Sequence, residues 1–274
     1  MGAIRVGPAR CPSRESPELA VELLLERGYS ACEIDFERGF WLDYPGAERL
    51  GELARANDIA LSIHAPLFAF PGHPEEKKEK QARGALDRSA GIAAACGAEV
   101  VVIHPGFWLN REREQTLADV VSSLETLRER LEEKDRAVPF GVEVMGRVRE
   151  LGSIDDVLEI ARRVDWVRPV IDFAHMHATS DGAYTDVDAF ATVLEGADEV
   201  LGADEPFHIH FSDIAYANRN ETKHLPYGDG TLRAEPLRDA LARFDRPGTV
   251  ISESPDEESS QAIKAVLYAG VSTA

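Results

Sequence analysis

Short apolar runs rich in β-branched residues recur along the chain, and each is followed by a longer segment with mixed polar and apolar positions. Runs of this length and composition are typical of buried strands. The predicted strands cover residues 4–6, 32–35, 60–63, 99–103, 140–144, 169–171, 207–210 and 249–251. Their near-continuous hydrophobicity favours a sheet that is covered on both faces.

A helical spacing of apolar positions marks the segments between these strands. The predicted helices cover residues 17–27, 46–57, 75–96, 112–133, 154–164, 187–194, 236–244 and 257–267. Regular alternation of strand and helix predicts a parallel sheet, because parallel neighbours are joined by crossover helices. Eight such units in one domain over residues 1–274 predict an α/β fold, a single (β/α)8 TIM barrel. An open doubly wound sheet is the weaker alternative.

Potential metal ligands stand at or just past the ends of six of these strands. They are His64, His104, His175 and His210, together with Glu143, Asp172 and Glu253. Because a barrel gathers the carboxyl ends of its strands at one face, we expect these side chains to converge there. Imidazole and carboxylate groups together form the ligand set of zinc or a similar divalent ion. Taken singly, Glu143 and Asp172 fit a buried ion pair equally well, and His210 fits a histidine paired with Asp213.

Length, composition and the absence of certain motifs exclude several classes of protein. The 274 residues are 44% hydrophobic, which suffices for one large core, and no apolar run approaches the length of a membrane span. The three cysteines form no CxxC pair, and neither GxGxxG nor GxxxxGKS/T spacing occurs. A disulfide framework, a thiolate metal cluster and a nucleotide site are therefore not indicated. We expect a cytoplasmic protein with no membrane partner, and the oligomeric state is left open.

The charge of the chain is strongly acidic. Asp and Glu number 49 against 30 Lys and Arg, which gives a formal net charge of −19. Such a surface repels nucleic acid over long range and argues against a nonspecific DNA-coating protein. It suits solubility in a high-salt cytoplasm, where the repulsion is screened. Glu33, Asp35 and Glu37 add three negative charges at the end of the second strand, which favour sugar hydroxyls over a phosphate backbone.

Seven short motifs follow one another from the third predicted strand to the last. They read SIHAP at 62–66, IHPG at 103–106, VEVM at 142–145, DFAH at 172–175, HFSD at 210–213, KHLPYGDG at 223–230 and SESP at 252–255. Together these motifs resemble those of the endonuclease IV family, within the xylose isomerase-like TIM-barrel superfamily. The start of the chain lacks the Gly-x-His opening of that family, which indicates a divergent branch.

The resemblance implies three sets of zinc ligands. The first set is His64, His104 and Glu143, the second set is Glu143, Asp172, His210 and Glu253, and the third set includes His175 and His224. In the family the third set also takes an aspartate two residues before its last histidine. This chain has Thr222 at that position, with Glu221 one residue earlier. A threonine hydroxyl is a poor ligand beside a carboxylate, so we expect two ions, and a third only if Glu221 reaches it.

The implied activity is hydrolysis of a phosphodiester bond in DNA at an abasic site. Glu143 would bridge the ions and Glu253 would orient the attacking water, which makes these the two expected catalytic residues. Leu67, Phe68 and Phe70 would press into the DNA beside the lesion, and they suit an apolar cover on the barrel mouth equally well.

Two other functions remain open. A sugar isomerase or epimerase of the same superfamily needs a single ion, held by the second set, and acts on a small sugar. His64, His104 and His224 favour the hydrolase, because a single-ion sugar site does not need them as ligands. A non-catalytic metal-binding barrel is supported only by Thr222 and the acidic surface. His208, two residues before His210, is expected one layer deeper in the barrel, in a structural role.

Overall fold

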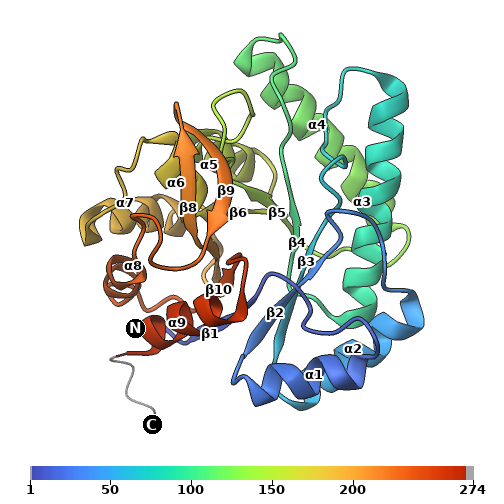
Figure 1. Cartoon of the computed structure of the whole chain (residues 1–274). Coiled ribbons are helices and arrows are strands. Elements are labelled where there is room, and N and C mark those ends of the chain that lie inside the picture. The colour runs from blue at the N-terminus through green and yellow to red at the C-terminus, as the bar shows by residue number, and fades with distance from the viewer. Residues whose placement is uncertain (1, 270–274) are drawn as a thin grey trace.

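Eight parallel strands form the centre of the computed structural model, which describes residues 2–269 (Figure 1). They are β1 (Ile4–Pro8), β2 (Ala31–Asp35), β3 (Ala60–His64), β4 (Val101–Ile103), β5 (Phe140–Glu143), β6 (Val167–Asp172), β7 (Phe207–Phe211) and β10 (Gly248–Ser252). Ladder hydrogen bonds run from β1 through β10, β7, β6, β5, β4 and β3 to β2. Ser30, just before β2, donates its N–H to the carbonyl of Val6 in β1 at 3.0 Å, so the two edges also meet. The predicted (β/α)8 barrel is confirmed.

Helices follow the strands in sequence and surround the barrel. They are α1 (Pro17–Glu26), α2 (Tyr44–Ala56), α3 (Glu76–Cys96), α4 (Arg113–Glu132), α5 (Ile154–Arg163), α6 (Phe173–Thr179), α7 (Val187–Asp198), α8 (Ala234–Leu241) and α9 (Glu257–Tyr268). Ser16, Asp43 and Asp256 cap α1, α2 and α9, and Ser153 forms a capping box with Asp156 at α5. Among residues 2–269, no helix combines the length and apolarity that a membrane crossing requires.

The sequence pattern does not predict two elements, α6 and a hairpin formed by β8 (Asp213–Ala217) and β9 (Asn220–Leu225). Helix α6 starts directly after β6 because Asp172 caps it, accepting the N–H of His175 at 2.8 Å. The hairpin turns at Asn218 and Arg219, whose positive φ angles of 51° and 61° suit a two-residue turn. Strand β9 is largely polar, so no apolar alternation marks it. The hairpin projects beside α6 (Figure 1).

Alternate side chains of each strand point toward the helices or into the barrel. On β2, Cys32 and Ile34 join the apolar core against the helices. Glu33, between them, points inward and meets His208 and His210, the inward-facing residues of β7. The barrel interior toward the carboxyl ends of the strands is therefore both buried and polar, and the metal ligands expected from the sequence lie there.

Candidate metal centre

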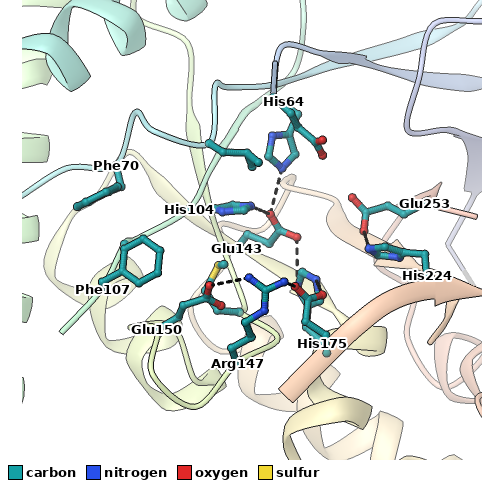
Figure 2. Close-up of a pocket in the computed structure, with 15 residues that line it drawn as sticks. His64, Phe70, His104, Phe107, Glu143, Arg147, Glu150, His175, His224 and Glu253 are labelled. Atoms are coloured by element: carbon teal, nitrogen blue, oxygen red, sulfur yellow. Dashed lines mark hydrogen bonds and ion pairs between the residues drawn. The ribbon is translucent and has the colours of Figure 1, made fainter. Parts of the chain in front are cut away.

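The carboxyl ends of six neighbouring strands supply most of the ligands expected from the sequence. They are His64 at the end of β3, His104 just after β4, Glu143 at the end of β5, Asp172 at the end of β6, His210 in β7 and Glu253 just after β10. The other two expected ligands come from the elements that the pattern did not predict, His175 from α6 and His224 from β9. Six of the eight line a pocket of about 290 Å³ at this end of the barrel (Figure 2).

Glu143 lies at the centre of the cluster, and its two carboxylate oxygens face different partners (Figure 2). Oε2 is 3.2 Å from Nε2 of His64 and 3.1 Å from Nε2 of His104. Oε1 is 3.1 Å from Nδ1 of His210. In the first set, one ligand atom from each residue lies within 4.8 Å of the others, and the same holds for the four residues of the second set. The two sets share Glu143.

Asp172 gives an independent test of whether the second set suits a cation. The side chain is fully buried, and Oδ1 accepts the N–H of His175. Oδ2 accepts no hydrogen bond from the described residues, since Nδ1 of His175, 3.2 Å away, bonds to the carbonyl of Val144. Burial raises the pKa of Asp172 well above its usual value, and Glu253 and Glu143 add to this while His175 opposes it. An unsatisfied buried oxygen among carboxylates and an imidazole fits a divalent ion.

Imidazoles and carboxylates balance each other's charge in the metal-free chain. Burial opposes protonation of His64, but the hydrogen bond and charge of Glu143 raise its pKa to about 10. Burial also opposes protonation of His210, and the charges of Glu33, Glu253 and Glu143 outweigh it and raise its pKa. The pKa of Glu143 is well below its usual value despite burial, because three imidazoles contact it. This cluster therefore stabilises positive charge, which a divalent ion also supplies.

The third set is completed differently from the pattern that the resemblance implies. Ligand atoms of His175, His224 and Glu253 lie within 4.8 Å of one another. Thr222 is exposed and donates its hydroxyl to the carbonyl of Ala215, so it is turned away from this group. The register of the hairpin shifts at Thr222, which leaves it as the extra residue of a β-bulge.

The bulge turns Glu221 into the pocket in place of Thr222. Its Oε2 lies 2.9 Å from Nε2 of His175. The pKa of Glu221 is lowered, because contacts with His175 and Arg147 outweigh its burial. From the sequence, a third ion is expected only if Glu221 reaches the third set. Glu221 does reach His175, which belongs to that set.

Sequence reasoning missed two charged residues of the pocket wall, Arg147 and Glu150. Arg147 lies between two carboxylates, with Nη2 3.0 Å from Oε1 of Glu221 and Nη1 3.6 Å from Oε1 of Glu150 (Figure 2). β-Bridges pin their loop to Phe107 on one side and Asn220 on the other. Burial raises the pKa of Glu150, whose Oε2 has no hydrogen-bond partner among the described residues. In the sequence, the signal that could have identified them is that both charged residues follow Glu143 closely, by four and seven positions.

The acidic residues of β2 and its loop do not act together as the sequence suggested. Only Glu37 lines the pocket. Asp35 forms ion pairs with Arg10 and Arg14, at 3.9 and 3.5 Å. Glu33 is fully buried beneath the pocket, because alternation along the strand turns it into the barrel.

Two further expectations concern β7 and the residues after it. His208 lies one layer below His210, as their two-residue spacing predicts, and it contacts Glu33. Asp213 does not pair with His210. Its carboxylate accepts the backbone N–H groups of Gly228 and Gly230 and a guanidinium N–H of Arg233.

Comparison with known proteins places this barrel in a family. Residues 21–269 match the model of the family described as xylose isomerase-like TIM barrel. An uncharacterized protein of Methanocaldococcus jannaschii is 32% identical over 91% of this chain and 91% of its own length. This chain belongs to the xylose isomerase-like TIM-barrel family.

Other proteins that this chain resembles are named as endonucleases or as epimerase-like. A probable endonuclease 4 of Latilactobacillus sakei is 28% identical over 72% of this chain and 65% of its own length. The structure of endonuclease IV from Thermus thermophilus superposes with a TM-score of 0.73 at 19% identity, covering 97% of this chain and 98% of that one. A D-tagatose 3-epimerase-like protein superposes with a TM-score of 0.75 at 21% identity, covering 97% and 96%.

These likenesses support the resemblance to endonuclease IV read from the motifs. The proteins that this chain resembles therefore include endonucleases and an epimerase-like protein. At such identities a superposition shows the fold alone, so the chemistry has to be argued from the pocket.

Proposed function

We propose that this chain is a metal-dependent phosphodiester hydrolase that cuts DNA at abasic sites, with zinc as the expected ion. The position of Glu143 carries the proposal. One of its oxygens contacts His64 and His104 and the other contacts His210, so the ligands form two sets that share one carboxylate. A bridging carboxylate between two such sets is a feature of two-metal hydrolytic centres. A single-ion site needs neither His64 nor His104.

Bound divalent ions would lower the pKa of a water molecule and offset the charge of the phosphate oxygens. Glu143 links the two sets, because contacts with imidazoles of both sets hold its buried carboxylate between them. We assign to Glu253 the orientation of the attacking water. Its Oε1 lies 3.3 Å from Nδ1 of His210 and its Oε2 lies 3.9 Å from Nε2 of His224, and it lines the pocket. Its carboxylate can accept a hydrogen bond from water at that wall.

Two features of the pocket mouth support a phosphate-bearing substrate. Leu67 and Phe68, on the loop after β3, are 44% and 60% exposed, which suits apolar contact with an unstacked base. Arg147 is the only arginine or lysine among the described residues that line the pocket. Its side chain is 37% exposed, and Glu221 and Glu150 hold it at the wall. A guanidinium has more N–H donors than these two contacts use, so Arg147 can also bind a phosphate oxygen.

Metal content and strand cleavage test the proposal together. Protein purified without chelator is expected to hold at least two divalent ions per chain, mainly zinc, by elemental analysis. It is expected to nick a duplex 5′ to a single abasic site, leaving a 3′-hydroxyl, without added magnesium. Glu253→Gln is expected to abolish nicking. The control Arg149→Gln changes an exposed residue of the Arg147 loop that lies outside the pocket, and it is expected to cut like the wild type. One ion at most, with no nicking, would overturn the proposal.

A sugar isomerase or epimerase is the second candidate, favoured by the acidity of the pocket. Glu37 and Glu150 add carboxyl groups to its wall, and one oxygen of Glu150 has no hydrogen-bond partner among the described residues. Sugar hydroxyls are suited to such groups. Metal-dependent interconversion within a panel of ketoses, without nicking, would select this function. An ion-loaded protein that is inactive in both assays would select the non-catalytic barrel.

A further inference from the structure

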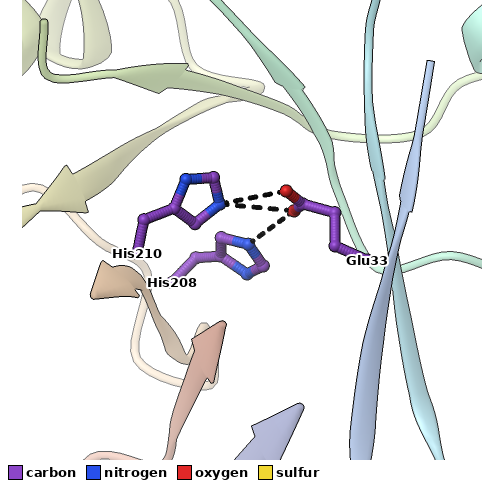
Figure 3. A group of neighbouring side chains, drawn as sticks. All are labelled: Glu33, His208 and His210. Carbon is purple, nitrogen blue, oxygen red and sulfur yellow. Dashed lines mark hydrogen bonds and ion pairs between the residues drawn. The ribbon is translucent and has the colours of Figure 1, made fainter. Parts of the chain in front are cut away.

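A buried carboxylate lies directly beneath the second ligand set. Glu33 is fully buried on β2 and reaches across the barrel interior toward β7 (Figure 3). Its Oε2 accepts the hydroxyl of Ser62 at 2.8 Å and lies 3.3 Å from Nε2 of both His208 and His210. Its Oε1 lies 3.2 Å from the same nitrogen of His210. The sequence grouped it with Asp35 and Glu37 as a charge at the end of β2, and the barrel instead turns this side chain into its interior.

The two ring nitrogens of His210 face opposite ways. Nε2 faces Glu33, and Nδ1 lies 3.1 Å from Oε1 of Glu143 and 3.3 Å from Oε1 of Glu253. A neutral imidazole has one N–H donor and one lone pair. A carboxylate can only accept a hydrogen bond, and carboxylates face both nitrogens of His210. An ion in the second set would bind Glu143 and Glu253, so the proton would stay on Nε2 against Glu33 and the lone pair of Nδ1 would face that set.

We propose that Glu33 is a positioning residue for the second ion: it fixes the tautomer and ring orientation of His210, so that Nδ1 is the ligand atom. The arrangement is that of a carboxylate–histidine–metal triad, in which the outer carboxylate also makes the imidazole a better ligand. The proposal rests on the metal centre proposed above and not on the reaction, because both candidate reactions use the second set.

The surroundings of Glu33 explain why it acts through His210 and does not itself bind an ion. Ligand atoms of Glu33, His208 and His210 also lie within 4.8 Å of one another. An ion bound between Glu33, His208 and His210 would take a lone pair on Nε2 of His210. To bind an ion of the second set as well, the same ring would need a second lone pair, on Nδ1. The ring would have to lose both protons. Hydrogen bonds from Ser62 and the two imidazoles reach Oε2 of Glu33 without that cost, and Oε1, which accepts no hydrogen bond from the described residues, lies 3.2 Å from Nε2 of His210.

Zinc titration of a one-ion protein gives the direct test. His104→Ala removes a ligand of the first set alone, so in that background zinc binding reports mainly on the second set. Adding Glu33→Gln keeps the shape of the side chain and removes its charge. Zinc affinity, measured by competition with a chromophoric chelator, is expected to fall about 10- to 100-fold, the usual effect of losing such a partner.

Asp35→Asn is the matched control. Asp35 lies two residues further along β2, faces the same side of the strand, and pairs with arginines instead of a ligand. In the same background it is expected to change zinc affinity less than threefold. Equal affinity in the Glu33→Gln and Asp35→Asn proteins would overturn the proposal. Absence of zinc binding by the wild-type chain would instead overturn the metal centre itself, which is a distinguishable result.

Nitrogen-15 NMR of the zinc-loaded wild-type protein tests the same assignment without a variant that risks misfolding. The His210 ring is expected to show a protonated Nε2 and a metal-bound Nδ1. A protonated Nδ1 with zinc on Nε2 would contradict the role given to Glu33, whatever the affinity measurements show.

Discussion

Replacing Glu143 by glutamine is expected to weaken both ions of the centre at once. The amide keeps the size of the side chain and removes the charge that the two sets share. Oε2 faces His64 and His104 at 3.2 and 3.1 Å, and Oε1 faces His210 at 3.1 Å, so neither set keeps a charged oxygen from this residue. By contrast, His104→Ala removes a ligand from the first set only.

The size of the effect follows from the burial of Glu143, which is 1% exposed. Water does not screen a charge at this depth, and removing one partner of a buried charge pair costs about 3 to 5 kcal/mol. At about 1.4 kcal/mol per factor of ten, each ion is expected to bind at least about 100-fold more weakly. Competition titration of the metal-free protein measures the two constants separately. If Glu143→Gln keeps one ion at wild-type affinity, the carboxylate does not bridge the sets.

The same variant has a second readout in the stability of the metal-free protein. Contact with Glu143 raises the pKa of His64 from 6.5 to about 10 in the fold, although burial opposes this. Because folding raises the pKa of this histidine, its protonated form stabilises the folded state. This contribution is complete below pH 6.5 and is lost as the pH rises through about 10. The melting temperature of the metal-free wild-type protein is therefore expected to fall between pH 6.5 and about 10. That of Glu143→Gln is expected to fall less over the same range. Parallel pH profiles for the two proteins would contradict the pairing.

Three smaller predictions concern other parts of the molecule. Glu221→Gln is expected to lower occupancy of a third ion at His175, whereas Thr222→Asp is expected to leave it unchanged because Thr222 faces away; elemental analysis of zinc-saturated protein compares them. The charge of −19 predicts a melting temperature that rises with added salt as repulsion is screened, and a flat or falling trend would remove that argument. Burial raises the pKa of Cys96 to about 11, whereas a hydrogen bond to Cys32 lowers that of half-buried Cys11. Iodoacetamide at pH 8 is therefore expected to modify Cys11 well before Cys96 by peptide mass mapping, and equal rates would refute this.

The sequence by itself determined the barrel and pointed to most of its candidate ligands. Hydrophobic runs and helical spacing are local signals, and eight strand–helix units leave few ways to close a parallel sheet. Once the strands are located, residues at their ends must share one face, which is why His64, Glu143 and Asp172 could be grouped before any contact was known.

Only the tertiary structure decided which oxygen, nitrogen or neighbour each ligand faces. Along the chain Glu33 is one of three acidic residues at the end of β2, and it becomes a buried partner of His210 only because β2 and β7 face each other across the barrel. Thr222 occupies the expected ligand position in sequence, but a bulge in a polar hairpin turns Glu221 inward instead. Register and closure depend on pairing between distant segments, and local periodicity carries no information about that pairing.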